Sequence, residues 1–208
     1  AELRAGRKLS EIIPQIARRF GVRATVLPMS DDAVRTFVQV KRRPPLPFQE
    51  YFVRRRARGA VEKIELRGIE NARPLPEALR VIRQAAAVIL APSNPFVSLG
   101  PILGLPGVIE ALSSVKGRVA AISPLVGGHT IKGPADKMMR GLGHEVSPLG
   151  IARLYREFIG LFVLDNIDRR YLPPIEALGV RCVATDTIMA TPARAARLAN
   201  VVMSALEV

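Results

Sequence analysis

Residues 85–101 read AAAVILAPSNPFVSLGP, an apolar run that ends at a loop of prolines and small polar residues. A continuous apolar run is typical of a strand buried on both faces of a parallel sheet. Pro92 and Pro95 restrict the backbone, so Ser93 and Asn94 are held between them. The same layout recurs where Val119–Ile122 precedes SPLVGGHTIKGP, residues 123–134. Two such loops at the ends of buried strands predict a site for a phosphorylated ligand.

Strand and helix patterns alternate along the second part of the chain. We expect strands at residues 87–90, 119–122, 161–164 and 180–184, and helices at 108–114, 135–142, 149–159, 174–178 and 192–206. Thr191 before Pro192 is a favoured start for the last of these helices. The alternation predicts an α/β, Rossmann-like fold, with a mostly parallel sheet, helices on both of its faces and a smaller α+β insert.

The first part of the chain is more charged and is interrupted by proline. Its patterns predict a helix over residues 10–20 with Ser10 as N-cap and Gly21 as its stop, strands over 22–27, 34–40 and 61–66, and a helix over 74–86. We therefore divide the chain into residues 1–80, a partial N-terminal core plus the α+β insert, and residues 81–208, a Rossmann-like nucleotide-binding core.

Composition narrows the class of protein. The single cysteine, Cys182, excludes an intrachain disulfide, and no cysteine and histidine cluster has metal-ligand spacing. No apolar run approaches the length of a membrane span, so we expect a cytoplasmic protein without a membrane partner.

The formal net charge of +13 is concentrated at residues 41–43 and 54–58. These segments can be read as solvated basic loops, as a surface that steers phosphates, or as a sequence-independent nucleic-acid surface. No nucleic-acid-binding motif accompanies the charge, so nucleic acid is not an expected partner.

Polar residues follow each expected strand, and in an open parallel sheet the ligand lies outside these carboxyl ends. Ser93 and Asn94 follow the first strand, and Gly127, Gly128 and Lys132 follow the second. Glycines let backbone amides approach an anion, and a lysine adds a positive charge, so this second loop resembles a phosphate cradle. A flexible turn with a surface lysine is the alternative reading.

The same edge carries carboxylates. Asp165, Asp168 and Asp186 are candidates for binding Mg²⁺, and they can equally cap helices or form turns. His129 and His144 have no partners at a triad spacing, so the catalytic residue remains unassigned. We expect Met138, Met139, Leu142 and Met189 to pack in the core.

Several ordered motifs resemble those of the CofD family, the 2-phospho-L-lactate transferases of coenzyme F-420 biosynthesis. The resemblance runs from about Leu3 to Leu206. It rests on residues 27–32, 48–53, 91–95, 98–103, 123–124, 127–128, 131–138 and 186–189.

The resemblance implies a transferase that moves a 2-phospholactate or enolpyruvyl phosphate moiety from a GDP-activated donor to the deazaflavin Fo, with release of GMP. It implies Mg²⁺ as cofactor and a homodimer. By resemblance Asn94, Ser98 and Gly100 hold the guanine nucleotide or its phosphates, and Gly127, Gly128 and Lys132 face the diphosphate. The segment 48–53 is expected to shape the deazaflavin pocket or a dimer contact.

The sequence departs from the family pattern at its start. The family's first strand, its glycine-rich loop and a following aspartate-containing stretch lie upstream of Leu3 in that pattern, and we expect this chain to lack them. The alternatives are therefore a transferase, a truncated or non-catalytic nucleotide-metabolite-binding relative, and a polyanion-binding protein that depends on the positive charge.

Overall fold

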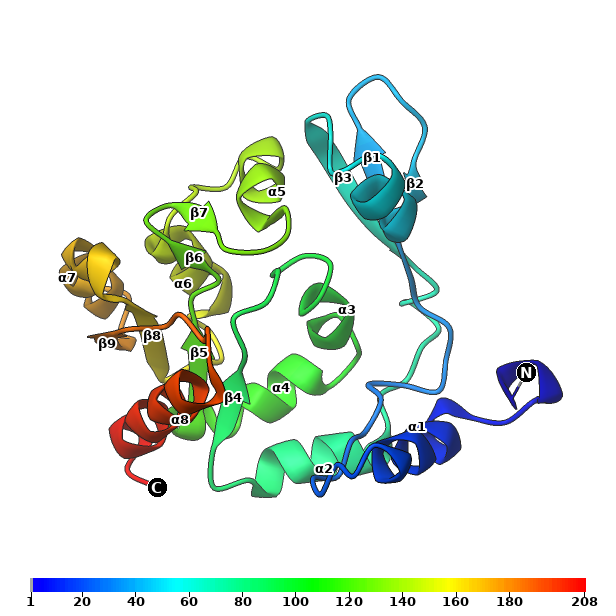
Figure 1. Ribbon diagram of the computed structural model, residues 1–208, viewed down its shortest axis with the longest axis horizontal. Helices are drawn as coiled ribbons and strands as arrows, with labels where there is room; N and C mark the ends of the chain where they lie inside the picture. Colours follow the sequence, from blue (N-terminus) through cyan, green and yellow to red (C-terminus); the bar gives the residue numbers. More distant parts are fainter. Residues whose placement is uncertain (1) are drawn as a thin grey trace.

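The computed structural model describes residues 2–208 and contains a four-stranded parallel sheet (Figure 1). The strand order is β4 (Val88–Leu90), β5 (Val119–Ile122), β8 (Leu161–Asp165) and β9 (Arg181–Thr185). All three neighbouring pairs are parallel, with Ala121 opposite both Leu90 and Phe162. The predicted α/β class and its four strands are confirmed, with shifts of one residue at some ends.

Helices cover both faces of this sheet, as the sequence predicts. Helix α8 (Pro192–Leu206) packs through Leu198 and Val202 on the face that carries Ala120 and Val163. The opposite face of β5 and β8 packs against α4 (Val108–Ser113) and α6 (Pro148–Tyr155) in a larger cluster. Because successive strand residues point to opposite faces, β5 and β8 supply both clusters and are buried throughout.

Shorter elements complete this core. They are α3 (Gly100–Leu103), η3 (Lys116–Arg118), the hairpin strands β6 (Leu125–Val126) and β7 (His129–Thr130), α5 (Ala135–Gly141), η4 (Asn166–Tyr171) and α7 (Leu172–Glu176). Helix α8 begins as predicted, because the Thr191 side chain accepts a hydrogen bond from the Arg194 amide.

The N-terminal part supplies an insert built on a three-stranded antiparallel sheet (Figure 1). Its strand order is β2 (Leu46–Pro47), β1 (Arg35–Val40) and β3 (Val61–Arg67), and the π-helical turn η2 (Glu50–Arg54) follows β2. Buried Tyr51 and Val38 pack with Met138 of α5, so the insert and the core share a hydrophobic cluster. The contact is close at Gly141, where an added Cβ would lie 2.2 Å from the Val61 carbonyl oxygen.

Two α-helices flank the insert, α1 (Leu9–Arg19) before it and α2 (Pro76–Gln84) after it. A short 3-10 helix, η1 (Glu2–Ala5), precedes α1. The prediction of Ser10 as N-cap of α1 is wrong, because Lys8 occupies that position and Ser10 lies inside the helix. Asp31 satisfies this helix end instead, accepting hydrogen bonds from the Ser10 amide and hydroxyl at 2.8 Å each. Gly21 follows the helix with φ of +68°, as its predicted stop role requires.

The strand predicted over residues 22–27 is absent from the structure. Strands β1, β2 and β3 pair only with one another, so this segment has no neighbouring strand to satisfy its backbone groups. Val22 and Val26 are 44% and 39% exposed, which shows that the segment gains little burial either.

Among residues 2–208, no helix combines the length and the apolar character needed to cross a bilayer.

The Cys182 thiol in β9 is expected to react slowly in the native protein. Burial, reinforced by the charge of Glu176, raises its pKa to about 12. Near pH 8 the thiolate fraction should therefore fall roughly 1000-fold below that of an unfolded chain. Alkylation by iodoacetamide, followed by mass spectrometry with and without urea, measures this difference. Equal rates in both conditions would contradict it.

Candidate functional site

A cavity of about 750 Å³ opens at the carboxyl edge of the parallel sheet. Its walls come from the loops that follow β4, β5 and β9, from the β6–β7 hairpin and the residues after it up to Ala135, and from Phe48 and Phe52 of the insert. The site therefore lies where parallel strands end, which is the position expected for a ligand in this fold. Both parts of the chain contribute to it.

The loop after β4 is ordered by Asn94. Its side-chain oxygen accepts hydrogen bonds from the amides of Phe96 and Val97, at 2.9 and 3.2 Å. Its backbone carbonyl oxygen accepts hydrogen bonds from the amides of Ser98 and Leu99. Its side-chain amide nitrogen lies 3.3 Å from the Met138 sulfur. Asn94 thus fixes the backbone that follows Pro95, up to Leu99, and also lines the cavity.

Four of the seven predicted ligand-binding residues meet in this cavity. Ser93, Asn94 and Ser98 lie on one wall, and Lys132 belongs to the loop that leads into α5. Lys132 is exposed and forms no salt bridge with a described carboxylate, so its ammonium group is available to an anion. Thr130 adds a hydroxyl, although that group already donates to the Gly133 carbonyl.

The three predicted glycines lie outside the cavity lining. Gly127 and Gly128 form the turn of the β6–β7 hairpin, with φ of +60° and +79°. The Gly127 amide donates to the Asp168 carboxylate at 2.9 Å, so this amide is engaged within the protein. Gly100 starts α3, and an added Cβ there would lie 3.2 Å from the Pro95 carbonyl oxygen. These glycines shape the loops that carry the lining residues.

The three aspartates predicted as candidate metal ligands each bind different groups of the protein. Asp165 accepts from the amides of Ile167 and Thr187 and from the Thr187 hydroxyl, tying the end of β8 to the loop after β9. Asp168 is buried and holds Gly127. Asp186 pairs with Arg197 at 2.6 Å and with Arg194 at 3.9 Å. Each carboxylate therefore stabilises a different part of the sheet edge.

The lining does not fit a magnesium ion held by protein carboxylates. Within residues 2–208, no three His, Cys, Asp or Glu side chains gather in a metal-binding group. The described lining offers hydroxyls, the Asn94 amide and the positively charged Lys132 but no carboxylate, whereas Mg²⁺ is usually held by one or two protein carboxylates together with substrate phosphates. We therefore assign no magnesium ligand in this chain.

One wall of the cavity is apolar and was only partly predicted. Phe48 and Phe52 stack with ring centroids 5.6 Å apart and planes 9° from parallel. Ile188 and Met189, from the loop after β9, also line the cavity. The prediction that Met189 packs in the core is wrong, since it is 47% exposed, whereas Met138 and Met139 are fully buried as predicted. Met189 follows β9 in a loop, where burial is not imposed by the sheet.

The two histidines have different surroundings. His129 is exposed, and its Nδ1 is 3.9 Å from the carboxylate of Asp136. Asp136 is itself held by the Thr130 hydroxyl and the Lys137 amide. His144 stacks on Phe96 with a centroid distance of 5.3 Å. Neither histidine lines the cavity.

Comparisons with known proteins agree with this architecture. A family model described as "2-phospho-L-lactate transferase CofD" matches residues 1–202. A 2-phospho-L-lactate transferase from Methanosarcina mazei is 34% identical, covering 98% of this chain and 66% of that protein. One from Methanococcoides burtonii is 39% identical over 90% of this chain and 60% of its own length. A phosphoenolpyruvate transferase from Kitasatospora aureofaciens is 33% identical, with 99% and 65% coverage.

Solved structures support the fold. A Bacillus halodurans protein superposes with a TM-score of 0.65 at 16% identity, covering 94% of this chain and 67% of that one. A second structure of the same protein, described there as a UPF0052 family member, gives a TM-score of 0.62 at 15% identity, with 94% and 66% coverage. The chain spans between 60% and 66% of the length of the three curated relatives named above. With a family model matched over residues 1–202, the chain belongs to the CofD family.

Proposed function

We propose that this chain acts as a transferase in coenzyme F-420 biosynthesis. It would move a 2-phospholactate or enolpyruvyl phosphate moiety from a GDP-linked donor to the deazaflavin Fo, and release GMP. The relatives named above are 2-phospho-L-lactate and phosphoenolpyruvate transferases, which supports the reaction class. The observation that carries the proposal is one cavity that combines hydroxyls and a lysine with a stacked aromatic pair.

The polar wall suits the donor. A GDP-linked phosphoester carries a diphosphate, whose oxygens only accept hydrogen bonds. Ser93 and Ser98 offer hydroxyl donors, and Lys132 offers a positive charge without a carboxylate partner of its own. The prolines and the Asn94 hydrogen bonds hold the Ser93–Ser98 backbone in place, so little ordering is needed when the donor binds.

The chemistry of the transfer needs positioning and charge neutralisation. A hydroxyl of the acceptor forms a new bond to the phosphorus of the donated phosphoester as the bond from that phosphorus to the GMP oxygen breaks. The hydroxyl proton is lost to water, and GMP leaves with the bridging oxygen. Lys132 would stabilise the negative charge that grows on the leaving GMP. No described side chain in the lining is assigned as a general base.

The aromatic wall suits the acceptor. A deazaflavin has a flat, extended ring system, and flat rings stack favourably on aromatic side chains. Phe52 is 40% exposed and stacks on Phe48 at the cavity, so a face of this pair is accessible to a ring. The insert would thereby place the acceptor opposite the loops that hold the donor.

Replacing Phe52 by alanine should raise the KM for Fo by about tenfold and leave the KM for the donor near its original value. The reason is the loss of a stacking surface worth about 1–3 kcal/mol. Steady-state kinetics with each substrate varied in turn measures the two effects separately.

Phe20→Ala is the matched control, because Phe20 lies after α1 and is 82% exposed away from the cavity lining. It should leave both KM values unchanged. If Phe52→Ala raised the KM for the donor and left the KM for Fo unchanged, the aromatic wall would not hold the acceptor.

The function itself is tested by incubating the 208-residue chain with Fo and each GDP-linked donor, and by following GMP and the new phosphodiester by chromatography. Parallel reactions with Mg²⁺ and with a chelator test the Mg²⁺ requirement that the family resemblance implies. GMP formed in equal amount to the phosphodiester supports the proposal. Thermal stabilisation by the donor without GMP from either donor would refute it and favour the non-catalytic binding protein.

A further inference from the structure

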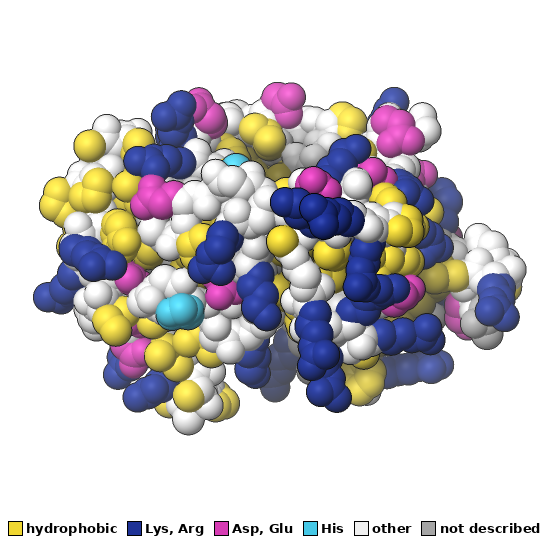
Figure 2. All heavy atoms as spheres, turned by 90° about the horizontal axis from the view of Figure 1, so that it is seen from above, with side chains coloured by type: hydrophobic (Ala, Val, Ile, Leu, Met, Phe, Trp, Pro, Cys, Tyr) yellow, Lys and Arg dark blue, Asp and Glu magenta, His cyan; other side chains and the backbone are white. Residues whose placement is uncertain are grey.

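A second cationic surface lies on the insert, apart from the cavity described above. Two adjoining hollows of about 700 and 770 Å³ share residues 58–60 and Lys41 in their linings. We call them together the basic groove. Figure 2 looks onto the end of the molecule that carries the insert and α5, and Lys and Arg side chains gather over the insert half. The cations of the groove are Lys41, Arg43, Arg54, Arg55, Arg56, Arg58, Lys137 and Arg140.

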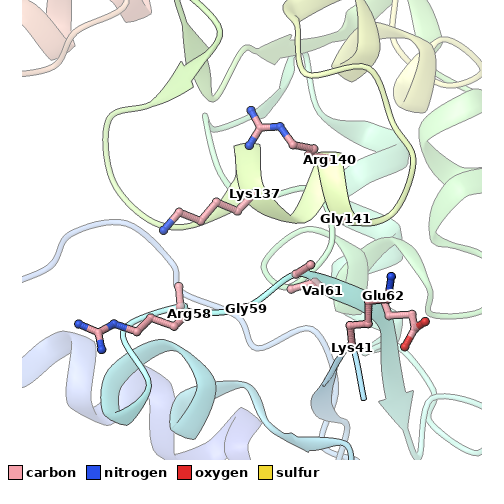
Figure 3. Close-up of a pocket in the computed structure, with 10 residues that line it drawn as sticks. Lys41, Arg58, Gly59, Val61, Glu62, Lys137, Arg140 and Gly141 are labelled. Carbon is pink, nitrogen blue, oxygen red and sulfur yellow. The ribbon is translucent and has the colours of Figure 1, made fainter. Parts of the chain in front are cut away.

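These charges are largely uncompensated within residues 2–208. Of the eight cations only Arg55 has a carboxylate within salt-bridge distance, Glu50 at 3.4 Å. One carboxylate, Glu62, belongs to the lining. Lys137 and Arg140 come from α5 and lie on the other side of the first hollow from Lys41 and Arg58 (Figure 3). Mutual repulsion of cations disfavours such a cluster unless an anion occupies it.

The backbone that carries the arginines is fixed rather than loose. The Tyr51 hydroxyl donates to the Ala57 carbonyl, and the Ala57 amide donates to the Tyr51 carbonyl. Arg56 and Ala57 both have φ of +50°, a conformation that costs free energy in residues with a Cβ. Buried Ala57 and Tyr51 belong to the cluster that joins the insert to α5, so packing holds the strained turn in place.

The lining also defines the chemistry of the anion. Glu62 is the sole side-chain hydrogen-bond acceptor among the described lining residues, so a ligand with its own N–H donors, such as an acidic peptide, finds few partners. No aromatic ring lines either hollow, so nothing is available for a nucleobase to stack on. A ligand that consists of acceptors and negative charge suits this surface, and two adjoining hollows suit a linear one.

We propose that the basic groove binds a linear chain of linked phosphate groups without bases. This site lies beyond the proposed transfer reaction, because none of its eight cations lines the cavity at the sheet edge. Arginine forks and lysine ammonium groups would contact successive phosphates, with most of the affinity coming from release of counterions.

The test measures binding of fluorescently labelled inorganic polyphosphate to the 208-residue chain at several salt concentrations. The triple variant Arg54→Gln, Arg56→Gln, Arg58→Gln should bind about 30-fold more weakly at low salt, and its salt slope should fall by about 2. The matched control is Arg18→Gln, Arg19→Gln, Arg23→Gln, which removes the same charge from exposed arginines of the α1 region. This control should bind like the unmodified protein.

Three results would overturn the proposal. The control triple variant could weaken binding as much as the groove variant, which would reduce the effect to net charge. A single-stranded oligonucleotide could bind more tightly than polyphosphate of equal charge, which would assign the surface to nucleic acid. Poly-glutamate of equal charge could bind as well as polyphosphate, which would remove the phosphate preference. Circular dichroism of both variants checks that they remain folded.

Discussion

Replacing Lys132 by alanine should lower kcat/KM for the GDP-linked donor by about 100-fold. Lys132 is the sole cation in the described cavity lining, so its loss leaves the growing charge on the leaving GMP without a positively charged partner. Removal of one preorganised group of this kind costs about 10²–10³ in rate. Most of the loss should appear in kcat, since the charge grows during the transfer step. Steady-state GMP release measures both parameters.

Lys116→Ala is the control for this variant. Lys116 precedes β5, at the opposite edge of the sheet from the cavity. Its replacement by alanine removes the same charge as the Lys132 variant. It should leave kcat/KM unchanged. If the two lysine variants lost activity equally, the account of Lys132 as a group that acts on the donor would be wrong.

Replacing Asp165 by alanine should destabilise the protein by about 3 kcal/mol. The carboxylate is 9% exposed and accepts three hydrogen bonds, from the Ile167 amide, the Thr187 amide and the Thr187 hydroxyl. Its removal leaves these donors unsatisfied near the core, at about 1 kcal/mol each. For a chain of this size Tm should fall by about 10 °C. Differential scanning calorimetry gives the change directly.

Asp186→Ala is the comparison, because Asp186 lies in the same loop, directly before Thr187, yet pairs mainly with surface arginines. Its loss should cost less than about 1 kcal/mol. The loss of stability in Asp165→Asn should lie between the losses in the two alanine variants. The asparagine oxygen still accepts hydrogen bonds, whereas its NH₂ group meets other donors. An Asp165→Ala variant as stable as Asp186→Ala would show that this carboxylate does not fasten the sheet edge.

The core of the fold could be predicted because its signals are local. Val119–Ile122 and Pro192–Leu206 have the predicted bounds, since an apolar run buried on both faces and a Thr-Pro helix start are set by neighbouring residues. The helix predicted over residues 149–159 ends at Tyr155 instead. Phe158 and Ile159 continue the apolar pattern, but they are buried by a turn that leads into β8.

In the insert, the strands predicted over residues 34–40 and 61–66 match β1 and β3 within one residue. The segment before the insert was predicted less well, because its structure depends on residues distant in sequence. Residues 22–27 have the composition of a strand, and only the completed β2-β1-β3 sheet shows that no partner remains for them. The end of α1 is satisfied by Asp31, which lies 21 residues after Ser10. A local capping rule favours Ser10, and no local pattern identifies Asp31.

In the candidate site, too, local rules predicted some features and missed contacts between residues distant in sequence. The rule that ligands lie at the carboxyl ends of parallel strands predicted that Ser93, Asn94 and Lys132 would lie together, and all three line one cavity. Ser98, which was assigned by resemblance, lines the same cavity. It could not tell that the Gly127 amide is taken by Asp168, a contact between residues 41 positions apart. The contribution of Ile188 and Met189 had two available signals, their place in the loop after β9 and the family motif at residues 186–189.

The central claim is that the GDP part of the donor binds in the cavity at the carboxyl edge of the sheet. A crystal structure of the 208-residue chain with GDP tests it most directly. The account predicts electron density for the diphosphate beside Lys132, with Ser93 and Ser98 within hydrogen-bond distance of its oxygens. Density for GDP in the basic groove, with the sheet-edge cavity lacking it, would contradict the account.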